Sequence, residues 1–148
     1  MADVTFVSRR DSSFREFPPA SAQLAVVLPF YGDLTVWIRK PGALGWHFPA
    51  SSRRSGETII EVAKRELWES ARVVTSRLDL LGAIRQDTPK PSTAYVYMCD
   101  AAHLPWSYEL PEGVDEVGVF RAPPAPMASE WSQTVLDYAL RARRLGLR

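Results

Sequence analysis

The stretch from Trp46 to Val74, WHFPASSRRSGETIIEVAKRELWESARVV, constrains the fold more than any other part of the chain. Its middle predicts one amphipathic helix over residues 57–71, entered through a turn at Gly56. One stripe of this helix is apolar and is expected to face a core. The stripe comprises Ile60, Ala63, Leu67, Ala71 and Val74.

Two carboxylates stand together beside this stripe. Glu66 and Glu69 are three residues apart and therefore neighbours on a helix, and Ser70 completes the same patch. Arg65 precedes them, with Glu61 one turn earlier as its expected ion-pair partner. Two adjacent carboxylates repel unless a cation compensates them, and a hard divalent cation with oxygen ligands does this well.

The order of the remaining elements predicts an α/β domain with a mixed sheet between helices. Alternating or β-branched segments favour strands over residues 4–7, 22–29, 34–39, 78–85, 95–100 and 116–120. A loop is expected over residues 50–56, and a long, proline-containing loop over 103–113. A second helix is expected over about 129–145, with Ser129 as its N-cap.

The central stretch resembles the Nudix box, G-x5-E-x7-R-E-U-x-E-E-x-G-U, where U is aliphatic. Glu57, Arg65, Glu66 and Glu69 fit this pattern in register. The other fitting residues, including the lead-in before the box, are Trp46, Phe48, Pro49, Gly56, Leu67 and Val73.

Four positions depart from the family pattern. Ser51 replaces the first glycine, Ala50 replaces the glycine before it, and Ser70 replaces the second glutamate of the E-E pair. Arg72 replaces the closing glycine, so either a left-handed residue there costs on the order of 1 kcal/mol or the helix continues. The box is therefore degenerate.

The resemblance implies a fold, a reaction and a cofactor. The implied fold is the α/β/α sandwich of Nudix proteins, and the implied reaction is hydrolysis of a diphosphate linkage in a nucleotide derivative with Mg²⁺ or Mn²⁺. Glu66, Glu69 and the carbonyl of Ala50 would hold the metal, with Glu57 orienting Arg65. The lost carboxylate at Ser70 predicts weak metal binding.

A different class of function stays open beside hydrolysis. Ser70 and Arg54 favour a Nudix-fold module that has lost hydrolysis and binds a nucleotide or a protein. The family often adds a late acid, for which Glu112, Asp115 and Glu116 are the candidates. The candidate substrate-binding residues are Trp46, Phe48, Arg53, Arg54, Trp106 and Tyr108.

Length and composition set the outer bounds. The 148 residues predict one domain over 1–148, with residues 1–20 irregular or forming an edge strand. The net charge of +1 gives no reason to expect nucleic acid or an anionic membrane as partner. The single Cys99 favours a reducing compartment, so a cytoplasmic protein is expected, as a monomer or a homodimer.

Overall fold

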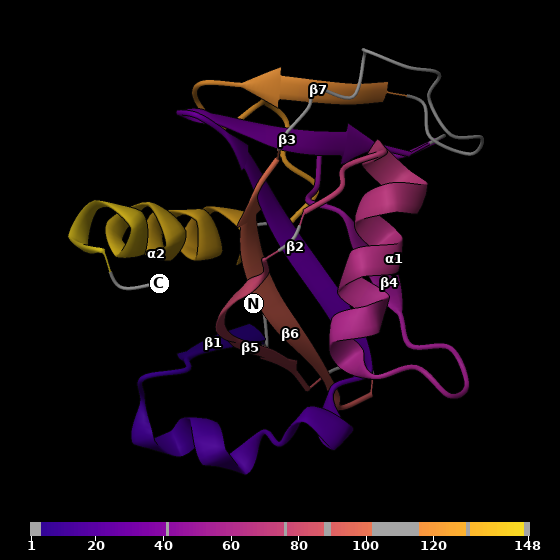
Figure 1. Cartoon of the computed structure of the whole chain (residues 1–148), viewed down its shortest axis with the longest axis vertical. Helices are drawn as coiled ribbons and strands as arrows, with labels where there is room; N and C mark the ends of the chain where they lie inside the picture. Colours follow the sequence, from indigo (N-terminus) through magenta and orange to yellow (C-terminus); the bar gives the residue numbers. More distant parts are fainter. Residues whose placement is uncertain are drawn as a thin grey trace.

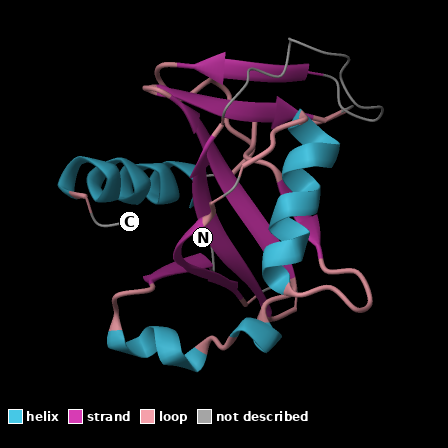
Figure 2. Cartoon of the chain, in the orientation of Figure 1, coloured by secondary structure: helices cyan, strands magenta, loops and turns pink. Residues whose placement is uncertain are grey.

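One sheet and two α-helices form the core of the computed structural model, which describes residues 4–40, 42–75, 77–87, 90–101, 116–129 and 131–146 (Figures 1 and 2). The strands are β1 (Val4–Ser8), β2 (Leu24–Tyr31), β3 (Leu34–Arg39), β4 (Ala50–Ser52), β5 (Asp79–Gln86), β6 (Ser92–Asp100) and β7 (Glu116–Phe120). The α-helices are α1 (Ile59–Ala71) and α2 (Trp131–Leu145), and two short 3₁₀ helices, η1 (Ser12–Glu16) and η2 (Pro19–Ser21), precede β2.

The sheet is mixed, as the sequence predicts. Its strand order is β1-β5-β6-β2-β3-β7, and β4 pairs with the first half of β2. β2 and β6 run parallel, whereas the other pairs described are antiparallel. Gly32 supplies the positive φ of +60° in the β2–β3 turn, which explains why the chain can reverse within two residues there.

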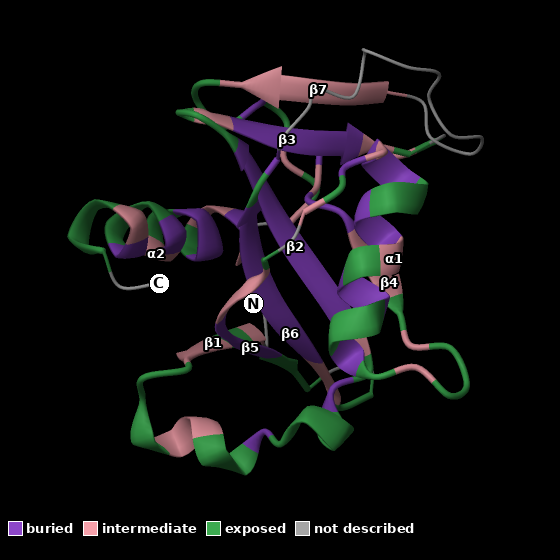
Figure 3. Cartoon of the chain, in the orientation of Figure 1, coloured by how far each residue is buried: buried purple, intermediate pink, exposed green. Residues whose placement is uncertain are grey.

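The two helices cover opposite faces of the sheet, which gives the α/β/α sandwich (Figures 1 and 3). Successive side chains of β2 point to opposite faces. Ala25 and Val27 pack in the core under α1, and Val26 and Leu28 pack in the core under α2. Because both faces are covered, β2 is a nearly continuous apolar run rather than an alternating one.

Helix α1 begins at a capping box. The Thr58 hydroxyl accepts a hydrogen bond from the Glu61 backbone N–H, and the Glu61 carboxylate accepts one from the Thr58 N–H. Glu61 is thereby used as a cap, so the predicted pair between Glu61 and Arg65 is wrong. Arg65 instead pairs with Glu57 and Glu69.

Three residues of the predicted apolar stripe, Ala63, Leu67 and Ala71, are buried as expected, but the other two are exposed. Ile60 is 39% exposed and Val74 is 61% exposed, whereas Ile59 and Val62 are buried. The reason is that the buried face also contains the polar Glu66 and Ser70, which a pattern of apolar residues alone places outside the core.

The two loops expected over residues 50–56 and 103–113 have different outcomes. Residues 50–52 form the short strand β4 rather than the start of a loop. The expected loop over 103–113 lies outside the described residues. Within the described ranges, no helix is long and apolar enough to cross a membrane.

Substitution of Arg72 tests whether the left-handed backbone at the end of α1 is strained. Its φ of +55° is left-handed, and its guanidinium lies 4.8 Å from the centre of the Trp68 ring. We expect Arg72→Gly to raise the free energy of unfolding by about 1 kcal/mol relative to Arg72→Ala, because both variants lose the ring contact and only glycine relieves the strained conformation.

Urea denaturation of the three proteins measures this difference. Lys64→Gly, at an exposed position inside the same helix, is the control and should lower the free energy of unfolding by about 1 kcal/mol. Equal stabilities for Arg72→Gly and Arg72→Ala would show that the left-handed residue carries no strain.

Candidate functional site

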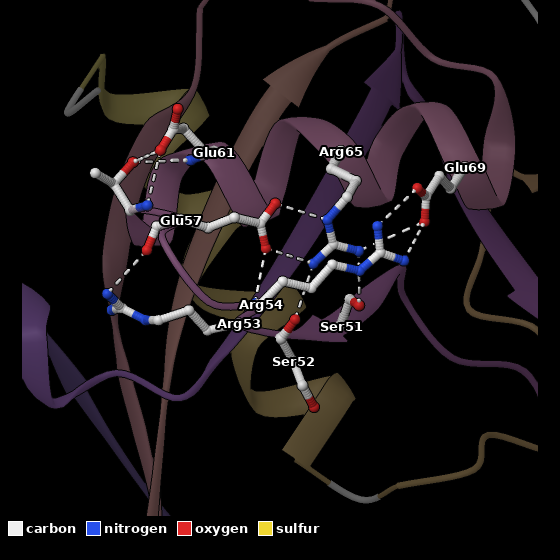
Figure 4. A network of polar contacts seen from close by, with 9 residues as sticks. Ser51, Ser52, Arg53, Arg54, Glu57, Glu61, Arg65 and Glu69 are labelled. Carbon is white, nitrogen blue, oxygen red and sulfur yellow. Dashed lines mark hydrogen bonds and ion pairs between the residues drawn. The ribbon is translucent and has the colours of Figure 1, made fainter.

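An ion pair between Glu57 and Arg65 joins the loop before α1 to the helix itself (Figure 4). Arg65 Nε and Nη2 donate to the two Glu57 carboxylate oxygens at 2.8 and 2.9 Å. This bidentate bond lowers the pKa of Glu57 to about 2 and raises the pKa of Arg65. Arg65 also donates to the Ser52 carbonyl at 2.9 Å and to the Ser51 hydroxyl at 3.3 Å, so one guanidinium fixes helix, loop and β4 together.

Glu69 lies on the outer side of α1 between two arginines. Its carboxylate oxygen Oε1 is 3.4 Å from Arg54 Nη2 and 3.4 Å from Arg65 Nη1. The Glu69 side chain is 44% exposed and that of Arg54 is 63% exposed. The chain's own cations therefore already compensate the charge of Glu69.

Glu66 has a different environment because it belongs to the buried face of α1. It is 4% exposed, and its Oε2 accepts a short hydrogen bond from the Ser70 hydroxyl. Burial raises the pKa of Glu66, while Ser70, the charge of Lys40 and a hydrogen bond with the Ala50 backbone oppose that rise. The sequence did not point to Lys40, because the effect of its charge on Glu66 depends on how close the end of β3 lies to α1 in the folded chain.

The described residues do not fit a Mg²⁺ or Mn²⁺ site. Such a cation needs several oxygen ligands that converge on one point. Glu66 is buried against Ser70, whereas Glu69 turns outward to Arg54 and Arg65. Across the described ranges, no group of three or more His, Cys, Asp or Glu side chains could hold a metal ion.

Glu116, a predicted late acid, does not join this cluster. Its carboxylate pairs closely with Arg39 on the neighbouring strand β3, and Arg39 lies over the Trp46 ring on the α2 side of the sheet. Val117 and Val119, by contrast, pack against the core under α1. Glu116 and Glu66 are therefore on opposite faces. Four further predicted residues, Trp106, Tyr108, Glu112 and Asp115, lie outside the described residues.

Trp46 and Phe48, predicted as ligand contacts, belong to the core under α2. Phe48 has no exposed surface and stacks on Trp37 at 3.8 Å between ring centres. Trp46 is 8% exposed and meets Phe120 edge-on at 5.0 Å. Trp46 and Phe48 are alternate residues of an extended segment and therefore share a face, which packs against the core under α2 rather than lining a ligand site.

Arg53 and Arg54 were predicted together as ligand contacts, but the structure separates them. The Arg53 guanidinium donates to the carbonyls of Pro19, Ala22 and Glu57 at 2.7–3.3 Å. It thus ties the N-terminal segment to the loop before α1. The Arg54 backbone N–H donates to Glu57 Oε1 at 2.8 Å, whereas its guanidinium projects outward and reaches the Glu69 carboxylate only at 3.4–3.5 Å.

A small cavity adjoins Ala50 on the α2 side of the sheet. Its volume is about 100 Å³, below the 300–1,000 Å³ of typical ligand pockets. Its walls come from β2, β4, β5, β6 and Trp131. The cavity beside Ala50 is therefore too small to enclose a whole nucleotide.

Comparison with known proteins places these features in a fold family. No protein-family model and no curated protein matches the chain. Among solved structures, a mutant form of the Bacillus subtilis pyrophosphohydrolase BsRppH is similar at 16% identity and a TM-score of 0.77, over 97% of this chain and 90% of that one.

Two further structures extend the comparison. The Nudix domain of Shewanella oneidensis NrtR, complexed with ADP ribose, has 17% identity and a TM-score of 0.65 over 91% of this chain and 94% of that one. A UDP-X diphosphatase has 17% identity and a TM-score of 0.68 over 90% of this chain and 70% of that one. At these identities the likeness concerns the fold, and the conclusion is that this chain has the fold of the Nudix hydrolases.

Proposed function

We propose that the chain binds a diphosphate-containing nucleotide derivative at the Glu57–Glu69 site and does so without a divalent metal. The proposal rests on one observation, which is that Arg54 and Arg65 flank the Glu69 carboxylate. A metal site would instead need a second acid beside Glu69, with both carboxylates directed at the same cation. The ligand class is supported by the similar folds, one of which is complexed with ADP ribose and another of which is named as a UDP-X diphosphatase.

Arg54 is the residue that would meet the ligand's phosphates. Its side chain is 63% exposed, and its contacts with Glu69 are long, at 3.4 and 3.5 Å. Such a weak surface pair costs little to open. A guanidinium recognises phosphate through two parallel hydrogen bonds. Arg65 is held by Glu57 at 2.8 Å, so its role is to position the loop that carries Arg54.

Hydrolysis is the second candidate, and the Glu57–Arg65 pair is the observation that favours it. That pair keeps the loop, β4 and α1 in a fixed arrangement. Glu66 and Glu69 remain at their box positions. Mg²⁺ or Mn²⁺ would then have to displace Arg54 from Glu69. Activity would therefore require a higher metal concentration than is needed by an enzyme whose site has three carboxylates.

Arg54→Ala tests the binding proposal. We expect calorimetry with ADP ribose to show binding by the parent that EDTA leaves unchanged. The variant should bind roughly 10- to 100-fold more weakly, since a hydrogen bond to a charged group contributes about 1.5–3 kcal/mol. Arg85→Ala removes an exposed arginine of β5 that pairs with Asp87 and is the matched control. Loss of binding in EDTA would contradict metal-free recognition.

Ser70→Glu tests the effect of restoring the second glutamate of the box pattern. Ser70 is 5% exposed and bonded to Glu66, so a larger acid there should lower the free energy of unfolding by about 1–3 kcal/mol without metal. Millimolar Mg²⁺ should restore part of that loss, because a ligand of the native state alone stabilises it. Thermal melts with and without Mg²⁺ measure both effects.

Ser70→Gln is the control, since it has the same bulk without the charge and should gain nothing from Mg²⁺. The same proteins are assayed for phosphate release from ADP ribose, nucleoside triphosphates and nucleotide sugars. We expect no release by the parent with Mg²⁺ or Mn²⁺. Metal-dependent release of phosphate by the parent would show that the protein is a hydrolase and would contradict the binding proposal.

A further inference from the structure

A cavity of about 590 Å³ lies between the first turn of α1, η2 and the strands β5 and β6. It adjoins the Glu57–Glu69 site but includes neither Arg54 nor the two box carboxylates of α1. Its volume is in the range of typical small-molecule pockets. Most of its wall is apolar or aromatic, from Ile59, Ile60, Leu78, Leu80, Tyr95 and Tyr97.

The charged groups on the wall of this cavity are already engaged within the protein. Arg53 donates to three backbone carbonyls, and the Glu57 carboxylate is held by Arg65. The Thr58 hydroxyl is part of the α1 capping box. No charge on the described wall is therefore available to a ligand unless an existing bond breaks, and an uncharged molecule fits the cavity best.

One polar group of the wall remains available. Tyr95 donates a short hydrogen bond to the Phe17 carbonyl, whereas the Tyr97 hydroxyl has no partner in the described part of the chain. The one fully buried side-chain polar atom without a partner there is Ser132 Oγ, so the Tyr97 hydroxyl keeps some exposed surface, and Tyr97 lines the cavity. Burial raises the pKa of Tyr97 to about 12, and the hydroxyl therefore stays protonated as a donor at neutral pH.

We infer that this cavity binds a small, uncharged, planar aromatic molecule whose hydrogen-bond acceptor is met by the Tyr97 hydroxyl. A flat ring fits because Tyr95 and Tyr97 lie edge-to-face, 6.3 Å apart, and offer aromatic surface to a third ring. Ile60, which is 39% exposed on α1, lies at the boundary between the cavity and solvent. Arg53 holds the η2 wall in place through the Pro19 carbonyl.

Coumarin and naphthalene form a matched pair of probes. Both are planar and uncharged, but only coumarin carries a carbonyl acceptor. We expect coumarin to bind the parent more tightly than naphthalene. Tyr97→Phe should weaken coumarin binding roughly 3- to 10-fold and leave naphthalene binding unchanged, since one hydrogen bond between uncharged groups is removed.

Tyr138→Phe is the control variant because it removes a hydroxyl on α2, where Tyr138 contacts Ser8. It should leave both affinities unchanged. Amide chemical shifts in an NMR titration locate the probe, and we expect changes at Ile59, Leu80 and Tyr97 but not at Glu69. Saturating ADP ribose should not compete, which keeps this site distinct from the proposed nucleotide site.

Leu80→Trp provides a second, independent test. The larger side chain should fill part of the cavity and abolish binding of both probes, and a thermal melt shows whether the variant is folded. Equal affinity of the parent and Tyr97→Phe for coumarin would show that the Tyr97 hydroxyl does not donate a hydrogen bond to the ligand. Shift changes centred on Arg54 and Glu69, or no binding by either probe, would overturn the site itself.

Discussion

The ion pair between Glu57 and Arg65 is the interaction on which the arrangement around α1 depends. Its two short hydrogen bonds cross from the loop to the helix, and the same guanidinium reaches the Ser52 carbonyl on β4. Because Arg65 and Glu57 are largely shielded from water, at 13% and 20% exposure, the pair is stronger than an ordinary surface pair. The loop before α1, β4 and Glu69 are all in contact with this one guanidinium.

Glu66, Glu69 and Ser70 on α1 have very different electrostatic surroundings. Glu66 is buried and hydrogen-bonded with the Ser70 hydroxyl and the Ala50 backbone. Glu69 is exposed, and Arg54 and Arg65 compensate its charge. In this site two arginines lie beside one exposed acid, while the second acid of α1 is buried.

The sequence predicted the fold well because the signals are local and repeated. β3 and β7 begin and end where predicted, and the box register placed Glu57 opposite Arg65 correctly. The site was harder to predict because a motif gives chain positions but not facing partners. Trp46 and Phe48 are core residues, and Arg53 binds backbone carbonyls, for reasons that depend on contacts far apart in the chain.

By itself, the sequence determined the order of strands and helices, the mixed sheet and the spacing of the box residues, since hydrophobic pattern and turn residues act over a few neighbours. Tertiary structure decided which carboxylate is buried and which is exposed. It also decided that Tyr95 and Tyr97 on β6 meet η2 and α1 around one cavity. These outcomes depend on how elements distant in the chain pack, and no local pattern encodes that packing.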